Sequence, residues 1–171
     1  MANLLKTERL IIRDTDLTDA GYVLELLSTK EYIENIGDRG VKTLEEAEEY
    51  IKSKSLPQLE KFGFGNFTVL LEGKRIGNCG VYIREGMEHP DLGFAFLPAY
   101  HGHGYGFEAA SAVLDFVKTQ TELKVLQAIT LPTNLPSLNL LKKLGFTHKS
   151  NFFLPNDPEE LVLLELKLDH K

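Results

Sequence analysis

The sequence predicts an α/β (α+β) fold in which one mixed, mostly antiparallel sheet is flanked by helices. Two observations support this prediction. Residues 67–97 contain three strand-like runs, and the first two are joined by the turn Glu72-Gly73-Lys74, which is typical of a β-hairpin. After residue 102, helix-like and strand-like segments alternate, which is typical of α/β sheets.

The N-terminal part is predicted to form a strand followed by helices. Leu4–Arg13 has the pattern of a strand, and a helix with a mostly apolar face follows it. Ser28–Val41, with two glycines and mixed charge, is expected to be a broken helix or a mobile loop. Thr43 and Glu46 have the spacing of a capping box, so the next helix is expected to begin there and to end near Pro57.

The remaining elements are expected in a simple order. Strands are predicted at Phe67–Leu71, Arg75–Arg84, Leu92–Leu97, Val125–Leu131, Phe146–Asn151 and Leu161–Leu168, and helices at about Gly106–Lys118 and Ser137–Leu144. No linker separates two domains, so residues 1–171 are expected to form a single domain.

The composition excludes several classes of protein. With 171 residues and a formal net charge of −6, the chain lacks the basic surplus expected of a nucleic-acid-binding domain. No apolar run approaches the ~18 residues of a membrane span, and charge at Lys6, Glu8 and Arg9 precludes a signal peptide. We therefore expect a cytoplasmic protein without nucleic-acid or membrane partners, and the lone Cys79 agrees with a reducing compartment.

The most informative segment is Leu92–Phe107, sixteen residues without Asp, Glu, Lys or Arg. It reads as an apolar strand, a loop with glycine at 102, 104 and 106, and the start of a helix. Exposed amides and the positive end of a helix dipole make such a loop suited to a pyrophosphate. The segment lacks the Gly-Lys-Ser/Thr of a Walker A loop, and Phe107 replaces the third glycine of a Rossmann fingerprint.

The pattern that remains is Gln/Arg-x-x-Gly-x-Gly/Ala, with His101 in the first position of His101-Gly102-His103-Gly104-Tyr105-Gly106. This resembles the acetyl-coenzyme A loop of the GCN5-related N-acetyltransferase (GNAT) superfamily. Three further segments are similar to signatures of its ribosomal-protein N-terminal acetyltransferase branch. They are Thr7-Glu8-Arg9-Leu10-Ile11-Ile12-Arg13, Asp91-Leu92-Gly93-Phe94, and Asn134-Leu135-Pro136-Ser137 followed by Lys143-Leu144-Gly145-Phe146.

The resemblance implies an acyl-CoA N-acyltransferase fold of about six to seven strands, splayed between the fourth and fifth. It implies direct transfer of an acetyl group from acetyl-CoA to a primary amine in a ternary complex. The branch implies that this amine is the N-terminal α-amine of a protein or peptide. The pantetheine would pair with backbone around Phe96 and Leu97, and Asn134 would bond one of its amides. The pyrophosphate would lie on the loop residues His101, Gly102, His103, Gly104, Tyr105 and Gly106.

Two catalytic residues are expected by the same resemblance. Asp91 occupies the place of a Glu in relatives and is the candidate base, with an exposed strand-start acid as the structural alternative and His89 as a second candidate. The usual tyrosine acid is replaced by Leu141. Ser137 is its substitute, although a serine at a helix start is also a common N-cap. Asn134 has the alternative of an Asx turn.

Other interpretations stay open at this point. The enzyme alternative acts on a small amine such as a polyamine, amino sugar or amino acid. The missing tyrosine also allows a non-catalytic CoA-binding regulatory module. His101 and His103 lack a nearby third ligand, so no metal is expected. The acceptor is expected near Ser28–Val41 and the loop 152–158, and a homodimer is possible.

Overall fold

Eight strands form one sheet in the order β1-β2-β3-β4-β5-β6-β8-β7. This computed structural model describes residues 2–169. The strands are β1 (Leu4–Lys6), β2 (Leu10–Asp14), β3 (Asn66–Leu71), β4 (Lys74–Tyr82), β5 (Asp91–Phe96), β6 (Val125–Thr130), β7 (Thr147–Phe152) and β8 (Leu161–Lys167). Neighbouring strands are antiparallel except β5 and β6, which are parallel. The predicted mixed, mostly antiparallel sheet is confirmed.

The eighth strand arises because Leu4–Arg13 is a hairpin rather than one strand. The amide of Thr7 donates to the carbonyl oxygen of Leu10 at 3.0 Å, and the amide of Leu10 donates to the Thr7 hydroxyl at 2.9 Å. The chain therefore reverses at Glu8-Arg9. This turn contains neither glycine nor proline, so the sequence carries no ordinary turn signal there.

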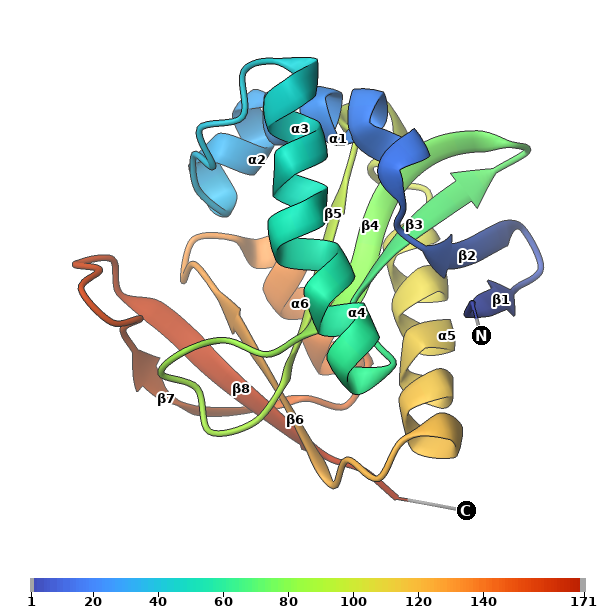
Figure 1. Cartoon of the computed structure of the whole chain (residues 1–171). Helices are drawn as coiled ribbons and strands as arrows, with labels where there is room; N and C mark the ends of the chain where they lie inside the picture. The colour runs from blue at the N-terminus through green and yellow to red at the C-terminus, as the bar shows by residue number, and fades with distance from the viewer. Residues whose placement is uncertain (1, 170–171) are drawn as a thin grey trace.

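Helices cover both faces of the sheet. They are α1 (Ala20–Leu27), α2 (Lys30–Asn35), α3 (Leu44–Tyr50), α4 (Leu56–Phe62), α5 (Tyr105–Gln120) and α6 (Leu135–Lys143), with short helical turns at Leu17–Asp19, Ile51–Ser55 and Pro98–Tyr100. Figure 1 shows α3 and α4 in front of the sheet and α5 behind it. Within residues 2–169, none of these helices has the length and apolar character needed to cross a membrane.

The helix that begins after Thr43 continues beyond Pro57, contrary to the sequence prediction. The Thr43 hydroxyl accepts from the Glu46 amide at 3.1 Å, so the predicted cap is present. The chain then passes through a π-helical turn, in which the Leu56 amide donates to the Ile51 carbonyl, directly into α4. Pro57 lies in the first turn of α4, at the change from π-helical to α-helical hydrogen bonding, and it removes one backbone bond from the continuous helix.

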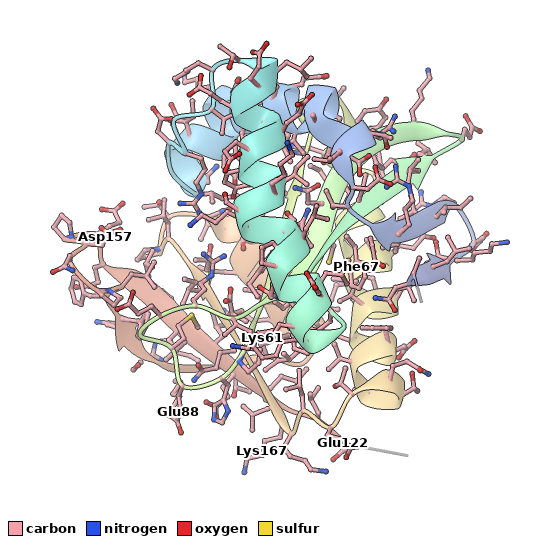
Figure 2. The ribbon with its side chains drawn as sticks, in the orientation of Figure 1. Lys61, Phe67, Glu88, Glu122, Asp157 and Lys167 are labelled. Atoms are coloured by element: carbon pink, nitrogen blue, oxygen red, sulfur yellow. The ribbon has the colours of Figure 1, made fainter. Side chains whose placement is uncertain are left out.

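Two apolar clusters hold the layers together. The larger one packs α5 against the sheet, and in it the fully buried Phe67 meets Phe116 edge to face at 5.5 Å between ring centres. Figure 2 labels Phe67. The smaller one joins α1 and α3 to the end of β5 through Leu97. Because β5 contributes to both clusters, its position is restrained on both faces. This strand also leads into the glycine loop.

A buried ion pair fixes the start of α1 against the sheet. The fully buried carboxylate of Asp19 accepts from Arg13 at 2.8 Å and from Arg75. Burial alone would raise the pKa of Asp19, but the hydrogen bonds from the two guanidinium groups outweigh it and lower that pKa to about 2.

Candidate active site

Strands β5 and β6 are paired at one position and diverge beyond it. Their single bridge joins Asp91 to Gln127, and the Gln127 amide donates to the carbonyl of Pro90 at 2.9 Å. Every other neighbouring pair in the sheet has at least three paired positions. The predicted splay, between the fourth and fifth strands when the N-terminal hairpin is counted as one, is therefore confirmed.

The register of β4 and β5 determines which backbone groups face the gap. The amide of Leu97 donates to Ile76 of β4 at 2.9 Å, and its carbonyl accepts from Tyr100 at 2.9 Å. In an antiparallel ladder, every second residue of a strand hydrogen-bonds the same neighbouring strand. Because Leu97 bonds β4, the backbone groups of Phe94 and Phe96 point away from β4, toward β6. Leu97 thus has no backbone group free for a ligand, whereas Phe94, which the sequence did not indicate, lies beside Phe96 at the gap.

Two glycines allow the Phe96 ring to sit between β4 and α5. A Cβ atom built on Gly77 would overlap that ring, and one on Gly106 would lie 3.0 Å from Leu140 Cδ1 and 3.7 Å from Phe96 Cε1. Gly106 lies inside α5, at the predicted helix start, and its φ is not positive. Its function in the fold is the close approach of α5, α6 and Phe96.

The other two loop glycines have a backbone conformation that glycine adopts readily. Gly102 has φ 78° and Gly104 has φ 81°, in the left-handed region that favours glycine. The first ladder bond of α5 runs from the Glu108 amide to the Gly104 carbonyl at 3.1 Å. The amides of Tyr105, Gly106 and Phe107 therefore precede the helical ladder and are available to an anion.

The two histidines of the glycine loop make different contacts. The His101 ring donates through Nε2 to the carbonyl of Phe96 at 2.7 Å, which fixes the loop against the end of β5. His103 stacks obliquely near Tyr105, with 5.7 Å between ring centres. Among residues 2–169 there is no group of three His, Cys, Asp or Glu side chains that could hold a metal ion.

A shallow cavity of about 570 Å³ lies beside the start of α5. Its lining combines the turn between β1 and β2, the first half of α5 and the end of α6: Lys6, Thr7, Glu8, Arg9, Gly104, Phe107, Glu108, Ser111, Ala112, Asp115 and Lys143. Lys143 also lies over the Phe107 ring, 4.5 Å from its centre. Phe107, one of the residues with a free amide, thus adjoins a recess whose edge carries both cationic and acidic side chains.

Asn134 and Ser137 lie at the start of α6, but Asn134 is the cap. Its side-chain oxygen accepts from the Ser137 amide at 3.3 Å, which leaves its NH₂ group without a protein partner among residues 2–169. Ser137 is the third helical residue, so the alternative that it is an N-cap is wrong. Within the same residues its hydroxyl makes no hydrogen bond, and the side chain is half-buried.

Asp91 lies where β5 and β6 begin to diverge, and it is not the exposed acid of the structural alternative. The residue is 1% exposed, and its carboxylate accepts from Arg84 Nε at 2.9 Å. Burial raises the pKa of Asp91 to about 6, although the positive charge of Arg84 opposes that shift. A carboxyl group with this pKa can exchange a proton near neutral pH. Sequence reasoning did not identify Arg84.

The second candidate base is held by different neighbours. The backbone amide of His89 donates to the side chain of Gln127 at 3.2 Å, and its ring lies 3.5 Å from Glu88. Figure 2 shows Glu88 at the periphery of the molecule. Of the two segments expected near the acceptor, Ser28–Val41 contains α2, and the loop after β7 places Pro155 against Gly86. Their role at the acceptor stays a prediction.

The splayed sheet, the glycine loop and the buried carboxyl define an acyl-CoA-dependent transferase of the GNAT type. Residues 9–147 match the family model described as "Acetyltransferase (GNAT) domain", and the chain belongs to this family. It is therefore an N-acetyltransferase, and acetyl-CoA is the cosubstrate that the family implies.

Particular relatives agree with this assignment. The chain is 31% identical over 150 residues to YnaD of Bacillus subtilis (strain 168), named an uncharacterized N-acetyltransferase, covering 86% of this chain and 85% of that protein. A GNAT-family acetyltransferase from Bacillus anthracis is 26% identical with a TM-score of 0.78, covering 96% and 98% of the two chains. The RimL ribosomal L7/L12 α-N-protein acetyltransferase bound to coenzyme A shares the fold, with a TM-score of 0.85 at 12% identity and coverage of 99% and 100%.

Proposed function

We propose that this N-acetyltransferase modifies the N-terminal α-amine of a protein or peptide, by direct attack of the amine in a ternary complex. The observation that carries the proposal is a buried carboxyl group, Asp91, at the point where β5 and β6 separate. Its pKa of about 6 makes it a base of modest strength. Such a base suits an α-amine, whose ordinary pKa is about 7.7–8.0, better than a lysine amine near 10.4.

The residues around the gap fit acetyl-CoA without a basic cluster. Amides at the start of α5 and the glycines before it would hold the pyrophosphate. The backbones of Phe94 and Phe96 and the free NH₂ group of Asn134 would bond the pantetheine arm. When bound, acetyl-CoA supplies an activated acyl group as a thioester.

The proton transfers are assigned to two side chains. Asp91, directly or through a water molecule, accepts the proton that the amine must lose, and Arg84 holds its carboxylate in place. The Ser137 hydroxyl, which has no protein partner among residues 2–169, is free to donate its proton to the departing thiolate and to take one back from water, so that no alkoxide remains. An amide of Phe94 or Phe96 directed at the developing oxyanion would contribute a few kcal/mol, by comparison with known oxyanion donors.

One observation favours a peptide acceptor, and a second is compatible with it. Structural neighbours that cover nearly the whole chain include the RimL acetyltransferase and a ribosomal-protein-S5-alanine acetyltransferase from Vibrio fischeri, which shares the fold at 19% identity and a TM-score of 0.79. The net charge of −6 also favours a cationic amine over an acidic acceptor.

The test compares matched peptides. Peptides beginning with Ala or Ser and carrying one internal lysine are offered with acetyl-CoA, each with a free and with a formylated N-terminus, and thiol release and the modified position are measured. We expect turnover on free N-termini and none on blocked ones. Modification at the internal lysine, or faster turnover on polyamines and amino sugars than on any peptide, would overturn the proposal.

A further inference from the structure

Arg9, in the turn between β1 and β2, makes three contacts with the glycine loop and α5. Its Nη1 donates to the carbonyl of His103 at 3.1 Å, and its Nε lies 3.3 Å from the Glu108 carboxylate. The guanidinium also lies over the ring of Tyr105, 4.5 Å from its centre. One side chain from the N-terminal hairpin thus contacts the loop and the first turn of the helix together.

The bond to His103 determines how the next peptide group points. In a trans peptide the carbonyl oxygen and the following amide hydrogen lie on opposite sides, and the chain has no cis peptide bond among the described residues. With the His103 oxygen held toward Arg9, the Gly104 amide points to the other side of the loop. Arg9 thereby biases one of the loop amides toward a fixed direction.

The contact with Glu108 matters for charge. Glu108 is the only acidic residue in the first turn of α5, and its side chain is only 18% exposed. A carboxylate there stabilises the helix by itself, because it lies at the positive end of the dipole. It also repels any anion that approaches the same amides, and Arg9 supplies the compensating positive charge.

We propose that Arg9 is a positioning residue for the coenzyme A loop: it orients the peptide between His103 and Gly104 and neutralises Glu108 beside the pyrophosphate. The proposal rests on the use of acetyl-CoA by this family and adds a residue whose action on the cofactor passes through other groups. Because the Arg9 side chain is 43% exposed, its removal should leave the fold intact.

Binding of coenzyme A without acceptor tests the proposal. Dissociation constants are measured calorimetrically for the wild type, Arg9→Ala, Glu108→Gln and the double variant. Lys52→Ala is the control, because it removes one exposed cation from the π-helical turn between α3 and α4. We expect about tenfold weaker binding for Arg9→Ala, a change within about twofold for Lys52→Ala, and recovery of at least about threefold when Glu108→Gln is added. Thermal unfolding of each variant checks the fold.

The outcomes separate the possible roles of Arg9. Binding by Arg9→Ala equal to the wild type overturns the proposal. A double variant as weak as Arg9→Ala overturns the neutralisation of Glu108, because Arg9 would then act only through the His103 carbonyl or as a direct ligand of the phosphate. If the wild type itself fails to bind coenzyme A, the proposed function falls together with this inference.

Discussion

Replacing Asp91 by Asn should stabilise the protein while it removes activity. The buried Asp91 carboxyl has a pKa of about 6 against an ordinary 3.8, chiefly because burial disfavours its charge. A raised pKa in an acid means that the folded state binds more protons than the unfolded state between pH 4 and 6. Stability therefore falls as pH rises through that window and stays lower above it. A shift of about two pKa units corresponds to about 3 kcal/mol of folding stability lost above pH 6. The isosteric, uncharged Asn avoids this loss.

The assay is urea unfolding of both proteins from pH 5 to pH 8. The free energy of unfolding of Asp91→Asn should exceed that of the wild type, and the difference should grow by about 1.4 kcal/mol over this range. Groups common to both proteins cancel in the difference. Asp115→Asn, an exposed carboxyl on α5, is the control and should show no such growth.

Activity provides the second half of this test. As the base, Asp91 should contribute about 10² to kcat/KM, and the variant should lose the limb of the pH profile near pH 6. A variant that is less stable than the wild type at every pH would refute the energetic reasoning. In that case the pair with Arg84 at 2.9 Å would more than offset the cost of burial. Unchanged kcat/KM would refute the catalytic assignment.

Three further predictions follow from the geometry. Asn134→Ala should lower stability by about 1 kcal/mol and raise KM for acetyl-CoA, because it removes the cap of α6, whereas Ser137→Ala should lower kcat without a stability change measurable by urea unfolding. Asp19→Asn should cost about 3–5 kcal/mol at pH 7, because two arginines lose their buried partner; in the wild type that stability should decline as pH falls from about 4 toward 2, which acid unfolding detects. Gly77→Ala should cost about 1–3 kcal/mol and weaken coenzyme A binding, because its methyl group displaces Phe96, and calorimetry with urea unfolding measures both effects.

The sequence predicted the elements that local residue patterns mark, and it missed those that depend on contacts with residues distant in the chain. The three central strands and the glycine loop were predictable because apolar runs and glycines mark them. The reversal at Glu8-Arg9 was not, because its turn is closed by the Thr7 hydroxyl rather than by glycine or proline. Pro57 was interpreted as a helix end, although a proline in a first turn fits a helix that resumes after a π-helical turn.

In the candidate active site, too, the residues that the fold alone brings together carried no sequence signal. The sequence prediction missed the cap of α6, because it began this helix at Ser137, although Pro136 is typical of a first helical turn and Asn134 is the cap. Arg9 and Arg84 carried no such signal, because their partners Glu108 and Asp91 are brought to them by the fold alone. The difference between Phe96 and Leu97 depends on strand register, which alternates at every residue and which composition does not reveal.

This dependence on backbone explains how the fold can keep one cofactor site at low sequence identity. The groups that would hold acetyl-CoA are mainly amides and carbonyls of β5, the glycine loop and the first turn of α5, and every residue type except proline supplies both. What the sequence must preserve is the path of the chain, through a few glycines such as Gly104 and a separated pair of strands. Side chains are then needed mainly to correct local charge, as we propose for Arg9 beside Glu108, or to move protons, as we propose for Asp91. We expect the acceptor to lie near α2 and the loop after β7, where side chains would determine which amine is accepted. Substitutions there should change the amine that is accepted while coenzyme A affinity stays constant.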